Sequence, residues 1–145
     1  MESNAFSYTI YIRTNRETLW EALTSAEYTW QYWGKMAIES YFTPGTAIQM
    51  VRESGEVSWR GMITEATDPS HIAFTWQLAQ IGDNLPEAPT QVSIHLETHG
   101  SLVRLVLEQK GFSPGSLVFP VASQAWPAIL SSLKSLLETG DVLVF

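Results

Sequence analysis

The chain has 145 residues, 45% of them hydrophobic, which excludes a disordered tail, and no apolar run approaches the roughly 18 residues of a membrane span. Its net charge of −7 leaves only eight Lys and Arg residues, whereas proteins bind phosphate backbones mainly through these side chains, so we expect no nucleic-acid partner. Cysteine is absent and the start MESNAF lacks the pattern of a secretory signal, so we expect one domain, residues 1–145, in the cytoplasm.

Residues 6–12 predict a half-buried strand, because apolar and polar side chains alternate along them. Two short helices are expected next. Thr14 and Glu17 match the T-x-x-E capping box that begins many helices, so Thr14 is expected to cap the first helix and Glu17 to lie in its first turn. The second helix is predicted over residues 25–33 and ends at Gly34, a residue suited to the positive φ of a helix end.

From Ile38 onward the side chains alternate with period two between turn signals, a pattern typical of an antiparallel meander with one covered face. The irregular stretch over residues 79–90 is expected to form a mobile rim. The residues predicted to face the covered side are Ile48, Met50, Trp59, Ile63, Ile72, Phe74, Trp76, Val92, Ile94, Leu96, Val103, Leu105 and Leu107.

The last long element is an amphipathic helix that can cover this sheet. Its apolar stripe runs over residues 126–137 with helical spacing, and we expect the helix to end near Thr139. Pro127 leaves two possible starts. The helix can begin at Trp126, with the proline in its first turn, or near Leu117, with a kink at the proline. We favour the longer helix, because residues 117–125 are too apolar for an exposed loop.

Several of these features follow one another in an order and spacing that resemble a known family. They are Trp20, Leu23, Thr24, Glu27 and Trp30; Pro44-Gly45; Gly61, Ile63, Glu65 and Asp68-Pro69; Phe74, Thr75 and Trp76; Gly111-Phe112; and the closing W-P-x-x-L-x-x-L-x-x-L-L-E-T-G. Together they resemble the Aha-type branch of the START-like (SRPBCC) superfamily, named for activators of the ATPase of the ninety-kilodalton heat-shock protein.

The resemblance implies an α+β helix-grip fold. In this fold a bent antiparallel sheet grips a long C-terminal helix, two short helices follow the first strand, and a cavity lies between sheet and helix. One departure is Ala125, where the family usually has Gly before the helix tryptophan. Heat-shock activators proper also carry a separate N-terminal domain, so chaperone activation does not follow from the family alone.

The sequence offers little catalytic chemistry. His95 and His99 lie four residues apart in a strand, hence about 13 Å apart, too far to share a metal directly. No nucleophile motif or phosphate-binding glycine loop occurs, so we expect no catalytic residue, metal or cofactor. Glu65 is in phase with the covered face, where burial would raise its pKa, although a carboxylate that reaches solvent at the strand end is the favoured alternative.

We therefore predict a binding site rather than an active site. Large rings would line a cavity between sheet and helix that suits a small apolar or amphipathic ligand bearing one acceptor. The expected lining residues are Trp33, Met50, Trp59, Ile63, Phe74, Trp76, Trp126 and Leu130. Two alternatives stay open: a protein-interaction or chaperone-accessory module with a protein partner, and a small cofactor-free enzyme of the cyclase or hydratase kind.

Overall fold

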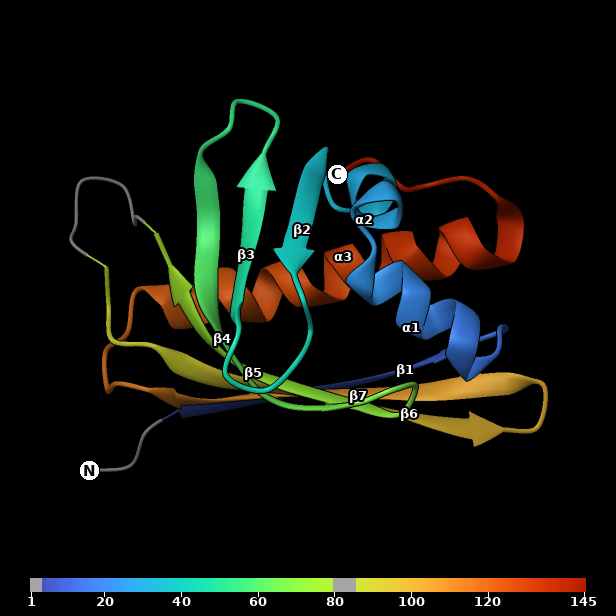
Figure 1. Ribbon diagram of the computed structural model, residues 1–145, viewed down its shortest axis with the longest axis horizontal. Coiled ribbons are helices and arrows are strands. Elements are labelled where there is room, and N and C mark those ends of the chain that lie inside the picture. The colour runs from blue at the N-terminus through green and yellow to red at the C-terminus, as the bar shows by residue number, and fades with distance from the viewer. Residues whose placement is uncertain (1–3, 80–85) are drawn as a thin grey trace.

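A computed structural model describes residues 4–79 and 86–145 (Figure 1). Within these ranges the chain forms three helices and a seven-stranded antiparallel sheet with the order β1-β7-β6-β5-β4-β3-β2. The elements are β1 (Asn4–Ile12), α1 (Arg16–Thr24), α2 (Ala26–Tyr32), β2 (Met36–Ser40), β3 (Ala47–Arg52), β4 (Val57–Thr67), β5 (His71–Leu78), β6 (Thr90–His99), β7 (Leu102–Phe112) and α3 (Val118–Thr139). The middle of the rim loop predicted over residues 79–90 lies outside the described residues.

The sheet bends sharply between its two halves. In Figure 1, β2, β3 and β4 rise steeply away from β1, β6 and β7, and α3 runs across the bend. Gly61 lies where β4 meets β5, and a Cβ atom there would be 1.7 Å from the backbone oxygen of Thr75. Only glycine allows so close an approach of two backbones, so this residue permits the local geometry.

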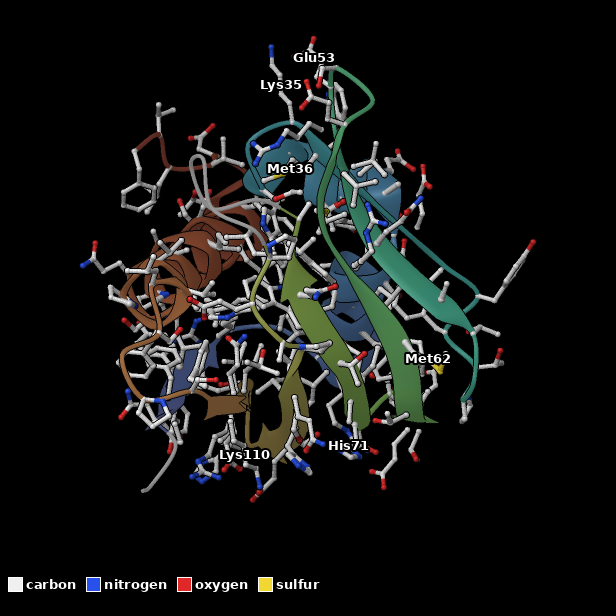
Figure 2. All side chains as sticks on the ribbon, turned by 90° about the vertical axis from the view of Figure 1, so that its left-hand side faces the viewer. Lys35, Met36, Glu53, Met62, His71 and Lys110 are labelled. Carbon is white, nitrogen blue, oxygen red and sulfur yellow. The ribbon has the colours of Figure 1, made fainter. Side chains whose placement is uncertain are left out.

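The covered face of the sheet is as predicted. Every strand residue assigned to that side is buried, whereas the alternate position Met62 lies on the outer surface (Figure 2). α3 and the pair α1 and α2 pack over this face. The predicted α+β helix-grip fold, with two short helices after the first strand, is therefore confirmed. None of the helices in residues 4–79 and 86–145 has the length and apolarity needed to cross a membrane.

The start of α1 differs from the prediction by one residue. Asn15, and not Thr14, is the N-cap, since its side-chain oxygen accepts a hydrogen bond of 2.8 Å from the backbone N–H of Thr18. Asn and Thr both cap helices well, so the sequence pattern alone did not separate the two neighbours. The expected capping box with Glu17 is wrong.

α3 is the long helix that we favoured. Pro127 lies inside it and removes one backbone hydrogen bond, and the helix ends where Gly140 takes a φ of 88°. The N-terminus of α3 is held by Glu87. Its carboxylate accepts hydrogen bonds from the Ser116 hydroxyl at 2.6 Å and from the Leu117 N–H at 2.8 Å. A negative charge at this end of a helix also interacts favourably with the helix dipole.

A buried hydrogen-bond chain fixes α3 to the sheet. The Trp126 indole N–H donates to Gln109 Oε1 at 2.8 Å, and Gln109 Nε2 donates to Thr90 Oγ1 at 2.9 Å. The Thr90 hydroxyl in turn donates to the backbone oxygen of Trp76 at 3.1 Å. Gln109 has no exposed surface, so its amide depends on these partners.

Candidate functional site

A pocket of about 240 Å³ lies between the bent sheet and α3. Four tryptophans from four elements form part of its wall: Trp33 at the end of α2, Trp59 on β4, Trp76 on β5 and Trp126 on α3. Their rings are in contact, since the ring centres of Trp33 and Trp126 are 5.3 Å apart and those of Trp59 and Trp76 are 6.1 Å apart. The other lining residues are Met36, Arg52, Ser58, Leu78, Val121, Ala122, Ala125 and Ile129.

Side chains fill the space deeper in the core. Only about 20 Å³ remains there, lined by residues that include Leu23, Phe74 and Ile94. That volume is close to the room that one water molecule needs, so no organic ligand fits. The usable space is therefore at the rim of the sheet, above the tryptophans.

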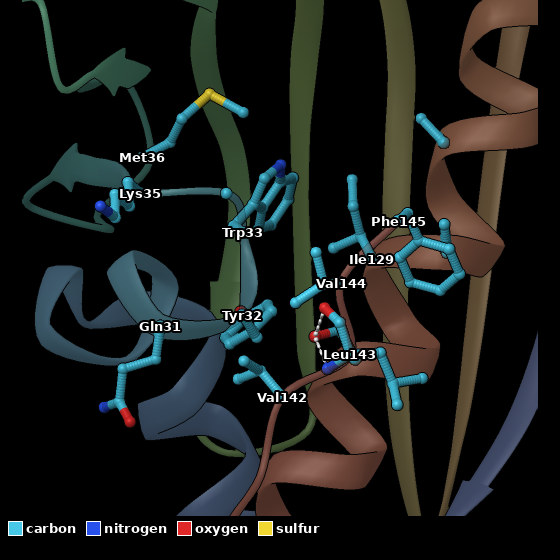
Figure 3. Close-up of a pocket in the computed structure, with 14 residues that line it drawn as sticks. Gln31, Tyr32, Trp33, Lys35, Met36, Ile129, Val142, Leu143, Val144 and Phe145 are labelled. Atoms are coloured by element: carbon cyan, nitrogen blue, oxygen red, sulfur yellow. Dashed lines mark hydrogen bonds between the residues drawn. The ribbon is translucent and has the colours of Figure 1, made fainter.

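A wider groove of about 630 Å³ adjoins this pocket and shares Trp33, Met36, Ala125 and Ile129 with it. Figure 3 shows the groove between α2 and α3, with the C-terminal segment Val142–Phe145 along one side. The backbone of this segment is held at one point. Leu143 N–H donates to the Ser132 hydroxyl at 3.0 Å, and that hydroxyl donates to the Leu143 oxygen at 3.3 Å.

Three polar groups in the small pocket have no hydrogen-bond or ion-pair partner in the described parts of the chain. The Trp76 indole N–H is buried and lacks an acceptor. Ser58 is buried because a β-bulge leaves it unpaired with β3, between the pairs Met50 with Trp59 and Val51 with Val57. Arg52, at the end of β3, is exposed. An unsatisfied buried donor costs about 1–3 kcal/mol, so a ligand with an acceptor would recover this energy.

The sequence also matches a known family. Residues 13–138 match the family described as "Activator of Hsp90 ATPase homolog 1-like protein". The chain belongs to this family. No curated protein matches the chain.

Several solved structures have a fold similar to that of this Activator of Hsp90 ATPase homolog 1-like protein. The Aha1 dimer from Colwellia psychrerythraea is 19% identical with a TM-score of 0.76, over 94% of this chain and 98% of that one. The protein MLL2253 from Mesorhizobium loti is 21% identical with a TM-score of 0.79, over 96% of this chain and 100% of the other. An HSP90 activator from Plasmodium falciparum is 20% identical with a TM-score of 0.69, over 84% and 86% of the two chains. At these identities the likeness concerns the fold alone.

The predicted lining residues separate into two groups in this family member. Trp33, Trp59, Trp76 and Trp126 line the pocket together. The remaining four lie deeper: Phe74 borders the small residual space, and Met50, Ile63 and Leu130 are buried and line none of these spaces. The ligand site remains a proposal, now placed at the tryptophan wall.

Sequence reasoning missed Arg52 and Ser58 as lining residues. Arg52 ends a strand, where a charged residue is ordinary, and Ser58 precedes Trp59, so simple alternation places the serine outside. The bulge that turns Ser58 inward depends on strand pairing and leaves no local signal.

A second polar cluster, on the outer face of the sheet, was also missed. Glu65 Oε2 lies 3.2 Å from His71 Nδ1, and the Ser93 hydroxyl lies 3.2 Å from His71 Nε2 and 3.1 Å from His95 Nε2. The two imidazoles stack with ring centres 4.0 Å apart. Figure 2 shows His71 at the opposite end of the sheet from Met36, which lines the pocket. A second bulge, between Ile63 and Glu65, places the Glu65 carboxylate on the outer face. This agrees with the favoured expectation that the carboxylate reaches solvent.

The order carboxylate, imidazole, hydroxyl in this outer cluster is the order found in serine nucleophile sites. Here the cluster lies on the outer face of the sheet, and its residues line neither the pocket nor the groove. Partial burial, together with the neighbouring His95, lowers the pKa of His71, and Glu65 opposes this change. The cluster therefore favours a neutral His71 near pH 7.

Proposed function

We propose that this protein binds a small apolar or amphipathic molecule in the pocket between its sheet and α3. The observation that carries the proposal is the Trp76 indole N–H, which is buried without an acceptor among residues 4–79 and 86–145, in the wall of a mostly apolar pocket. Buried donors in folded proteins almost always have partners, so an orphan donor at a pocket suggests that a ligand supplies the acceptor.

The dimensions of the site support the same proposal. The pocket of about 240 Å³ is small for an organic ligand, but it shares four lining residues with the adjoining groove of about 630 Å³. Together they fall within the roughly 300–1,000 Å³ of typical ligand sites, which are apolar with a few well-placed polar groups. An elongated molecule with an acceptor at one end fits this shape.

The test is isothermal titration calorimetry with 1-decanol, a neutral amphiphile with one hydroxyl group. We expect saturable binding that Ala125→Leu weakens about tenfold, because the added side chain fills the junction of pocket and groove. Ala5→Leu, at an exposed position of β1, is the matched control and should bind normally. Absence of saturable binding of decanol and of its charged ten-carbon analogues to the unaltered protein would refute the function.

Trp76→Phe tests the orphan donor itself, because it keeps most of the ring and removes the N–H. We expect decanol affinity to fall about fivefold, the equivalent of one hydrogen bond. Unchanged affinity together with unchanged stability would mean that Trp76 is only part of the wall and that the site is misplaced.

A second candidate function is a chaperone-accessory interaction, as the HSP90 activator from Plasmodium falciparum suggests. The observation in its favour is the apolar C-terminal segment, in which Val144 is 93% exposed and Phe145 is 82% exposed. Exposed apolar patches often mark protein interfaces. The double variant Val144→Ser with Phe145→Ser should then abolish stimulation of an Hsp90 ATPase, and lack of any stimulation by the unaltered protein would refute this candidate.

The third candidate, a cofactor-free cyclase or hydratase, has less support. Such an enzyme needs an acid and a base inside its cavity. Among the described residues, the ionisable side chains that line the pocket and groove are those of Lys35, Arg52 and Tyr32, and burial raises the pKa of Tyr32 so that it stays neutral. We place the binding function in the cytoplasm, the compartment expected from the sequence.

A further inference from the structure

We propose that the ligand is a carboxylate amphiphile, with its anionic head in the small pocket beside Arg52, Ser58 and Trp76 and its apolar chain in the wider groove. This inference rests on the proposed binding function. It adds the chemical class of the ligand and its orientation in the site.

The charge of the lining residues indicates the charge of the ligand. The chain has 15 acidic and eight basic residues, yet the described residues that line the pocket and groove include Arg52 and Lys35 and no Asp or Glu. The site is thus locally positive in a protein of net charge −7. The acidic neighbour Glu53 does not line the pocket and lies at the tip of the β3–β4 turn (Figure 2). A charged ligand of the opposite sign, an anion, is therefore favoured.

The available hydrogen-bond donors decide the orientation. In the small pocket, the Trp76 N–H and the Ser58 hydroxyl have no partner within the described chain, and Arg52 forms no ion pair there. In the groove, the Ser132 hydroxyl is already bonded to Leu143, and the Gln31 amide donates to the Glu27 backbone oxygen at 3.1 Å. Lys35, at the groove end, is exposed and also forms no ion pair within the described chain, so the buried free donors are the ones concentrated in the small pocket.

A carboxylate suits these donors better than a neutral head. It accepts several hydrogen bonds through two oxygens, and an arginine can bind it with two parallel N–H groups. From there the chain of the ligand would pass Ala125 and Ile129, which line both spaces, and reach the groove walls formed by Ala128 and Val142. Apolar contacts along this path supply affinity, and the head supplies selectivity.

Calorimetry with three ten-carbon probes tests the class of ligand: decanoate, 1-decanol and decyltrimethylammonium, each below its micelle concentration and at a pH where decanoate is ionised. We expect decanoate to bind about tenfold or more tightly than decanol, because hydrogen bonds between charged groups are the strong ones. The cationic probe should bind most weakly. Equal affinity for decanoate and decanol would overturn this inference and leave the binding function intact. No binding of any probe would refute the binding function itself.

Two matched variants test the orientation. Arg52→Gln and Lys35→Gln each remove one positive charge and keep a side chain of similar length. We expect Arg52→Gln to remove the preference for decanoate over decanol, whereas Lys35→Gln, at the groove end, should retain it. Similar losses in the two variants would indicate a general charge effect and overturn the placement of the head. Retention of the full preference in Arg52→Gln would overturn it as well.

Discussion

Gln109 should connect α3 to the sheet energetically as well as structurally. In Gln109→Met the apolar side chain keeps most of the volume, but the buried Trp126 N–H loses the acceptor that Gln109 provides. An orphan donor of this kind costs about 1–3 kcal/mol, so we expect a loss of about 2 kcal/mol in the free energy of unfolding. For a chain of this size that loss lowers the melting temperature by about 4–8 °C. Gln91→Met, the same change at an exposed position of β6, should cost less than about 0.5 kcal/mol.

A double-mutant cycle with Trp126→Phe separates this hydrogen bond from packing effects. Each single variant leaves one buried polar group of the Gln109–Trp126 pair without its partner, whereas the double variant leaves neither. The double loss, measured by urea denaturation, should therefore be smaller than the sum of the single losses by about 1 kcal/mol. Strictly additive losses would refute the reasoning, because they would show that the two side chains stabilise the protein independently.

Glu87→Gln should lower the free energy of unfolding by about 1 kcal/mol in chemical denaturation, because it weakens the hydrogen bonds to Ser116 and to the start of α3. Gly61→Ala should cost about 3 kcal/mol in the same assay, because its Cβ would meet the Thr75 oxygen at 1.7 Å. The lowered pKa of His71 means that the unfolded chain binds this proton more readily than the native protein. The contribution of His71 to the free energy of unfolding is therefore full above the ordinary pKa of 6.5 and is lost as the pH falls toward the lowered pKa. Between pH 7.5 and 5.5, the free energy of unfolding of His71→Gln should fall less than that of the unaltered protein in chemical denaturation.

The fold was predictable because each strand and helix has a local pattern of apolar and polar residues. Alternation along residues such as Ile72, Phe74 and Trp76 assigns the buried face of a strand without knowledge of its partners. In the same way, the helical spacing of the apolar residues in α3 identifies its buried face, on which Trp126 and Leu130 are buried.

The extent of empty space was not predictable, because it depends on how side chains from distant elements pack together. Met50 and Ile63 face the covered side as expected, yet they fill the core instead of lining a cavity. The inward position of Ser58 could not be predicted without knowing that β4 contains a bulge at this residue. The pairing of His71 with His95 requires the register of two strands joined by an irregular loop whose length sets no register.

The position of β1 in the sheet has a consequence for how the chain is made. β1 is paired only with β7, so that Asn4 pairs with Phe112 and Ile12 with Val103. At roughly 5–20 residues per second, the ribosome completes β7 about 5–20 s after β1. During that time the apolar side of β1 has no sheet to join, and such long-range pairing is intrinsically slow. The nascent chain is therefore open to aggregation until its last strand emerges.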